Sequence, residues 1–169
     1  DDEAVASGQG TIVDDVLLQL PKLERFVVPV GGGGLLSGVS ARLHELDRND
    51  IEVVGVQAEG SNSLERSLAA DTLSSADKPN QRYGGLAVQY VGEHTMKICI
   101  NTNQQRNLQL RTVSDRSVSA FMQQYIKSRD ENTDLPYEPS TLVAVTAASQ
   151  LQDNRVTVML GTGHNAPLV

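Results

Sequence analysis

Four consecutive glycines, residues 31–34, separate a short apolar run from an amphipathic segment. The run, residues 26–30, is rich in β-branched side chains and stops at the glycines, which predicts a buried strand. After the glycines, apolar residues recur at spacings of three, four and three, at Leu36, Val39, Leu43 and Leu46. That spacing predicts an amphipathic helix. Residues 51–56 predict a second buried strand, so the segment forms a βαβ unit, in which the two strands are parallel.

The same alternation continues along the chain. Further helices are predicted over residues 12–20, 63–70, 94–100, 114–126 (with Ser114 as the N-cap) and 140–151, and further strands over 108–113 and 156–160. Residues 72–81 are polar and contain a proline, which predicts a surface loop. We expect one α/β domain, residues 1–169, built as a doubly wound, mostly parallel sheet with helices on both faces. Ligands of such sheets bind at the carboxyl ends of the strands, where the glycines at 31–34 and 161–163 fall.

Charge and composition exclude several classes of function. The chain has 21 acidic against 14 basic residues and a net charge of -7, which argues against a nucleic-acid or anionic-membrane partner. No apolar run approaches the ~18 residues of a membrane-spanning helix. A single cysteine, Cys99, cannot form an internal disulfide, and its isoleucine neighbours predict a small buried side chain. We therefore expect a soluble, cytoplasmic protein.

The four glycines predict an anion site. Without Cβ atoms the backbone can curl and aim successive N–H groups at one point, and the following helix start adds a partial positive charge. A phosphate dianion is the natural ligand, whereas a simple flexible turn would not need four glycines. Leu35 follows the last glycine, so the loop lacks the Gly-Lys-Ser/Thr ending of the phosphate-binding loop of nucleoside triphosphatases. Glu59, near the end of the second strand, leaves a dinucleotide-binding domain open as a weaker alternative.

Several segments, taken in order, resemble the tryptophan-synthase-β-like (fold type II) family of pyridoxal-phosphate enzymes, and within it the threonine dehydratase, serine racemase and threonine synthase branch. They are SGQGT at 7–11, VPVGGGGL at 28–35, VGVQAE at 54–59, GLAV at 85–88, EPS at 138–140 and GTG at 161–163. The resemblance implies pyridoxal 5'-phosphate as cofactor and a lyase that eliminates water from threonine or serine. A threonine-synthase-like elimination and replacement enzyme, and a non-catalytic module that binds a phosphate ligand, remain as alternatives.

The resemblance also implies roles for individual residues. The cofactor phosphate would be held by the backbone of the loop and the residue after it: Gly31, Gly32, Gly33, Gly34 and Leu35. The hydroxyl of Thr162 would meet the pyridine nitrogen, Gly84 and Gly85 would pass close to the ring, and Glu138 would lie near the site at a helix start. His164, beside the turn that holds Thr162, is a further candidate for contact with the ligand.

Two features depart from the family pattern. The family's Schiff-base lysine lies upstream in a Ser-x-Lys context, and the lysines here are Lys22, Lys78, Lys97 and Lys127, none in that context. We therefore expect this chain to be the C-terminal part of a longer enzyme, inactive alone. The complete enzyme would need the N-terminal part, act on a small amino acid and form a homo-oligomer. Gln57 stands where the branch often has a metal-binding glutamate, so we expect no metal site.

Overall fold

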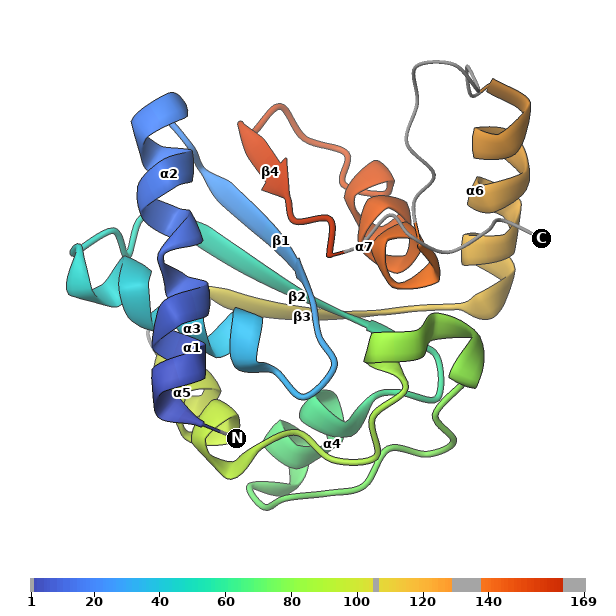
Figure 1. Cartoon of the computed structure of the whole chain (residues 1–169), viewed down its shortest axis with the longest axis horizontal. Helices are drawn as coiled ribbons and strands as arrows, with labels where there is room; N and C mark the ends of the chain where they lie inside the picture. The colour runs from blue at the N-terminus through green and yellow to red at the C-terminus, as the bar shows by residue number, and fades with distance from the viewer. Residues whose placement is uncertain (1, 105–106, 129–137, 163–169) are drawn as a thin grey trace.

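The computed structural model describes residues 2–104, 107–128 and 138–162 of the chain (Figure 1). Within these residues, the centre is a four-stranded sheet in the order β3-β2-β1-β4. The strands are β1 (Arg25–Pro29), β2 (Glu52–Ala58), β3 (Leu108–Val113) and β4 (Thr157–Met159). Each neighbouring pair is parallel. The parallel sheet predicted from the apolar runs is therefore confirmed.

Helices cover both faces of this sheet (Figure 1). They are α1 (Glu3–Gly10), α2 (Ile12–Gln19), α3 (Gly34–Glu45), α4 (Ser63–Ala70), α5 (Glu93–Gln104), α6 (Asp115–Ser128) and α7 (Pro139–Ser149), with a 3₁₀ segment, η1 (Gln81–Leu86). Side chains from α2, α3, α4 and α5 pack in one core cluster, and side chains from η1, α6 and α7 pack in a second. The doubly wound architecture is thus confirmed.

The strand β1 contributes to both clusters, which explains its unbroken apolar sequence. Phe26 and Val28 belong to the cluster under α3, whereas Val27 belongs to the cluster under α7. All three side chains are completely buried. A strand covered on both faces has a continuous hydrophobic run rather than an alternating one.

The helix α1 was not predicted, because its sequence is rich in poor helix formers such as Gly8 and Gly10. The side chain of Asp2 caps its start by accepting a hydrogen bond from the N–H of Ala4 at 2.8 Å. The rest of its stability comes from packing on α3 at very close range. A Cβ atom added to Gly10 would lie 2.6 Å from the carbonyl oxygen of Gly38. Tertiary packing therefore overrides the weak local propensity of this segment.

Most other predicted elements have the expected positions, and a few differ at their ends. The N–H of Ser117 donates to the hydroxyl of Ser114 at 3.2 Å, which confirms Ser114 as the cap of α6. The predicted strand 156–160 is shorter, because β4 pairs with β1 only from Thr157 to Met159. The predicted loop 72–81 holds except for Gln81, which opens η1.

An ion-pair cluster joins the amino ends of three strands. It lies at the opposite end of the strands from the glycine turn. Arg25 on β1 is almost fully buried and pairs with Glu52 on β2 and, at 2.6 Å, with Asp153 before β4. Arg155 pairs with the same Glu52 at 2.8 Å. These pairs link β1, β2 and the segment before β4 at their amino ends. None of the helices in the described ranges is both long and apolar enough to cross a membrane.

Candidate active site

A cavity of about 280 Å³ lies at the carboxyl ends of β1 and β4. Its wall comes from the end of α1, the turn between β1 and α3, the segment η1, the start of α7 and the residues after β4. The lining residues are Gln9, Pro29, Gly31, Gly32, Gly33, Gly34, Leu35, Gly85, Leu86, Glu138, Ser140 and Thr162. All the residues to which the family resemblance gave a role at the cofactor, except Gly84, therefore line one cavity.

The glycine turn takes a shape that side chains would prevent at two positions. A Cβ atom on Gly31 would lie 2.1 Å from the carbonyl oxygen of Gly85, so the two backbones touch. Gly33 has a φ of +91°, in the left-handed region, and serves as the N-cap of α3. At Gly32 and Gly34 a Cβ atom would have no neighbour within 4 Å, so the lack of side chains there leaves open space.

The first turn of α3 provides hydrogen-bond donors to the cavity. Because α3 begins at Gly34, the N–H groups of its first turn have no acceptor within the helix. Gly34 and Leu35 belong to this turn and line the cavity. The partial positive charge of the helix start adds to these donors. This wall of the cavity is therefore suited to an anion.

The segment η1 brings Gly85 against the glycine turn. Tyr83, next to the kink at Gly84, is buried, and its hydroxyl donates to the Asp115 carboxylate at 2.8 Å. Burial, followed by this hydrogen bond, raises the pKa of the Tyr83 hydroxyl above its ordinary value. Asn80 donates to the other oxygen of the same carboxylate at 2.8 Å. The start of α6 thus anchors η1 and fixes the position of Gly85.

The opposite wall is formed by the start of α7 and the residues after β4. Pro139 occupies the first turn of α7, as predicted, and Glu138 is the N-cap residue. The hydroxyl of Ser140 donates to the Glu138 carboxylate. The N–H of Thr162 donates to the hydroxyl of Thr141 at 3.1 Å, so α7 also holds Thr162 in place.

Four lining residues were not assigned a role from the sequence: Gln9, Pro29, Leu86 and Ser140. Each stands in or beside one of the segments that carried the family resemblance. Their nearness to the predicted site residues was the available signal. His164 lies outside the described residues. Cys99 is buried as predicted, and its burial raises the pKa of the thiol to about 12, which disfavours the thiolate.

The amide of Gln57 is used within the protein at both ends. Its Nε2 donates to the carbonyl oxygen of Ser61 at 2.9 Å, and its Oε1 accepts from the N–H of Glu65 at 3.0 Å. The side chain is buried. Among the described residues, no three His, Cys, Asp or Glu side chains gather in a group that could hold a metal ion. The expectation of no metal site stays a prediction.

Comparison with known proteins identifies the family. The family described as "Pyridoxal-phosphate dependent enzyme" matches residues 1–163. A biosynthetic L-threonine dehydratase of Pasteurella multocida is 36% identical over 99 residues, which cover 59% of this chain and 19% of that protein. An L-threonine ammonia-lyase of Thermotoga maritima is 37% identical over 97 residues, covering 57% of this chain and 24% of that protein.

A solved structure extends the match over the whole chain. The processed form of threonine deaminase isoform 2 from Solanum lycopersicum superposes with a TM-score of 0.80 and 27% identity, over 99% of this chain and 48% of that one. The chain thus spans about half the length of that structure, and its matched segment about a fifth to a quarter of the curated relatives. The chain belongs to the family of pyridoxal-phosphate dependent enzymes.

Proposed function

We propose that this chain forms the C-terminal part of a pyridoxal-phosphate-dependent lyase that eliminates water from a hydroxyamino acid, threonine or serine. One observation carries the proposal: the glycine turn, Gly85, Glu138 and Thr162 line a single cavity although they are far apart in sequence. The relatives named as threonine dehydratases and ammonia-lyases support the substrate class. The domain, residues 1–169, would then be one cofactor-binding unit of a longer enzyme.

The cavity suits the cofactor's phosphate at one wall. The glycine turn and Leu35 offer backbone N–H groups at a helix start, and the contact of Gly31 with Gly85 leaves no room for a side chain there. Glu138 adds a carboxylate to the α7 wall, which disfavours an anion on that side. We therefore assign the phosphate to the glycine turn. When bound, pyridoxal phosphate supplies an aldehyde for the substrate's amino group and a ring that withdraws electrons from its Cα.

Thr162 is assigned to the nitrogen of the cofactor ring. A hydroxyl can donate or accept a hydrogen bond but fixes no charge at the nitrogen, unlike a carboxylate. It would therefore leave the ring nitrogen largely unprotonated. The hydrogen bond from the Thr162 N–H to Thr141 supports a fixed position for this residue.

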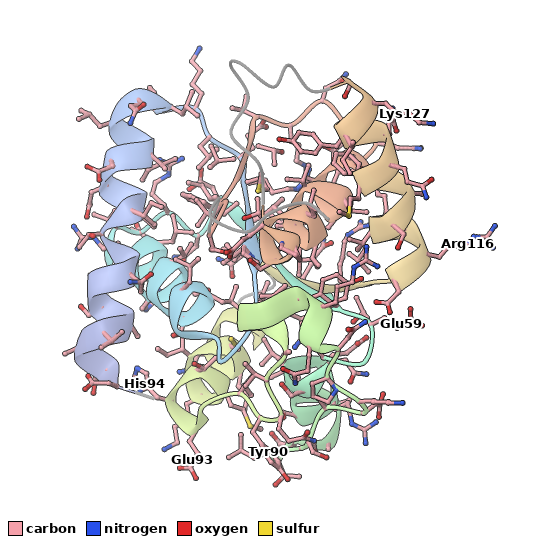
Figure 2. All side chains as sticks on the ribbon, turned by 45° about the vertical axis from the view of Figure 1, so that its right-hand side comes forward. Glu59, Tyr90, Glu93, His94, Arg116 and Lys127 are labelled. Carbon is pink, nitrogen blue, oxygen red and sulfur yellow. The ribbon has the colours of Figure 1, made fainter. Side chains whose placement is uncertain are left out.

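The catalytic amine has to come from outside this chain. Lys22 precedes β1 at its amino end, Lys78 lies in a loop, and Lys97 is on α5. Figure 2 places Lys127 on the outer side of α6. None of the four lysines, all within the described residues, lines the cavity. The N-terminal part would thus supply the lysine, and the complete enzyme is predicted to be cytoplasmic and homo-oligomeric.

Two other functions remain as candidates. The lack of a lysine at the described cavity favours a non-catalytic module that binds a phosphate ligand. A threonine-synthase-like enzyme would share the same cavity and differ in its reaction.

The test is to combine the chain with the segment encoded upstream and to measure 2-oxo acid release from threonine and from serine. The lyase predicts release with the combined parts and none with either part alone. If the combined parts bind pyridoxal phosphate through its phosphate but release no 2-oxo acid, the non-catalytic module would be favoured instead.

A further inference from the structure

One peptide of the glycine turn, between Gly32 and Gly33, is held from outside the cavity. The carbonyl oxygen of Gly32 accepts a hydrogen bond from the N–H of Gly92 at 3.1 Å. It accepts a second from the hydroxyl of Thr95 on α5 at 3.3 Å. The start of α5 therefore fixes the direction of this carbonyl group.

The direction of the Gly32 carbonyl also sets the direction of the Gly33 N–H. No peptide bond in the described residues is cis. In a planar trans peptide the C=O and the following N–H point in opposite directions. Because the Gly32 carbonyl points towards α5, the Gly33 N–H points away from α5. Gly33 lines the cavity, whereas Thr95 does not.

Thr95 also contacts the other end of this peptide. A Cβ atom on Gly33 would lie 2.2 Å from the Cγ2 methyl of Thr95, so the methyl lies flush against the glycine. Thr95 is only 1% exposed and does not line the cavity. The Thr95 hydroxyl thus holds the Gly32 carbonyl, and the Thr95 methyl contacts Gly33, both from outside the cavity.

We propose that Thr95 is a positioning residue for the anion site: it orients the Gly32–Gly33 peptide so that the Gly33 N–H donates to a bound phosphate. The inference rests on the proposed function, which assigns the phosphate to this turn. It adds a buried residue on α5, 63 positions from Gly32 in sequence, that acts without touching the ligand.

The test compares two substitutions at this position with two probes. Thr95→Val keeps the shape and loses the hydroxyl, whereas Thr95→Ser keeps the hydroxyl and loses the methyl. The probes are pyridoxal phosphate and pyridoxal, which differ only in the phosphate. We expect Thr95→Val to weaken binding of pyridoxal phosphate about tenfold, as one misdirected hydrogen bond to an anion implies, and to leave pyridoxal within about twofold. Thr95→Ser should keep binding of pyridoxal phosphate within about threefold of the wild type.

The outcomes separate this inference from the function on which it rests. If the wild-type chain binds the two probes equally, the phosphate assignment fails and the inference fails with it. If the wild type prefers pyridoxal phosphate and Thr95→Val keeps the same preference, only the role of Thr95 is overturned. An equal loss of affinity for pyridoxal phosphate and for pyridoxal would indicate a general loosening of the cavity, and it would also overturn the role of Thr95.

A measurement on the unsubstituted chain guards against a Thr95→Val protein that does not fold. In an NMR titration with inorganic phosphate, the amide proton of Gly33 should move downfield as it donates to the anion. Gly8 on α1, which is not among the residues lining the cavity, is the internal control. A Gly33 amide that stays as still as that of Gly8 would show that this N–H does not reach the ligand, and the inference would be wrong.

Discussion

The N–H of Thr162 lies 3.1 Å from the hydroxyl oxygen of Thr141, a residue buried in the first turns of α7. The hydrogen bond joins residues 21 positions apart in the sequence and ties the segment after β4 to α7. One hydroxyl thus decides where a residue of the candidate site is held.

Replacing Thr141 with valine should release Thr162 from α7. We expect the amide of Thr162 to exchange faster with solvent and the free energy of unfolding to fall by about 1 kcal/mol, the usual contribution of one hydrogen bond. Hydrogen exchange and urea unfolding measure the two effects. Thr141→Ser retains the hydroxyl and is the control. Equal exchange rates in the valine and serine variants would contradict the role of the hydroxyl.

A negative charge at Gly32 should abolish phosphate binding while leaving the fold intact. Nothing lies within 4 Å of a Cβ atom at this position, so a small side chain meets no steric obstacle. Gly32→Asp would add a carboxylate beside the anion, and we expect affinity for pyridoxal phosphate to fall by about 100-fold or more. Gly32→Asn has nearly the same shape without the charge and should bind measurably better. If both variants bind alike, charge repulsion is not the cause.

The ion pair between Arg25 and Asp153 should make stability depend on pH in acid. The hydrogen bond from Arg25 is the main cause that lowers the pKa of the Asp153 carboxyl from 3.8 to about 2. A pKa depressed in the folded state gives stability that is present above about pH 4 and is lost as the pH falls towards the folded value. Asp153→Asn should therefore be less stable than the wild type at pH 7, and the difference should shrink below about pH 4.

Urea unfolding at a series of pH values measures this difference. Asp15→Asn, at an exposed position on α2, is a control for loss of a carboxylate as such. A gap between Asp153→Asn and the wild type that stayed constant from pH 7 to pH 3 would contradict the assignment.

Changing Gln57 to glutamate should destabilise the chain when no divalent cation is present. The carboxylate would be buried against the Ser61 carbonyl oxygen, which now accepts from the Gln57 amide. We expect a loss of about 3 kcal/mol in the presence of EDTA. The hydroxyls of Ser61 and Ser63 are buried and have no hydrogen-bond partner among the described residues, and with the new carboxylate they would offer oxygen ligands to a cation. Calcium should therefore recover part of the loss.

Thermal unfolding of both proteins with EDTA and with calcium tests this. The wild type should show the same melting temperature in the two buffers. A wild-type protein stabilised by calcium as strongly as Gln57→Glu would refute the prediction that the chain has no metal site at Gln57.

No lysine of this chain should react with the cofactor at the cavity. The four lysines lie outside the lining residues, and a covalent bond needs the amine within reach of the aldehyde. After incubation with pyridoxal phosphate and borohydride, mass spectrometry should find no stoichiometric pyridoxyl group on the isolated chain. One full adduct on a single lysine would show that the chain carries its own catalytic amine. In the combined protein, the adduct should appear on the upstream segment.

The sequence predicted the elements whose patterns are local. The run at residues 26–30, the glycines and the helix after them follow from the spacing of apolar side chains, and the structure has them as β1 and α3. In contrast, α1 contains two glycines and is stabilised by its contact with α3, which lies about 30 residues further along the chain. A contact of that kind leaves no periodic signal in either segment.

The candidate site divides in the same way. The glycine turn could be identified from its composition, whereas the roles of Gly85, Glu138 and Thr162 came from the family resemblance. The glycines at 161–163 marked the end of a strand but gave Thr162 no role. Thr95 was not singled out at all. Its role depends on the distance between its hydroxyl and the Gly32 carbonyl, and this becomes visible only when α5 packs beside α3.

The crossing of α1 over α3 ties the spacing of two helices to the width of the cavity. A Cβ atom on Gly38 would lie 2.1 Å from the carbonyl oxygen of Ala6, and Gln9, one turn further along α1, lines the cavity. A methyl group at Gly38 would push α1 away from α3, and Gln9 would move outwards from the cavity together with α1. The width of the cavity thus depends on one backbone contact between two helices, and a single carbon atom added there would widen the cavity at Gln9.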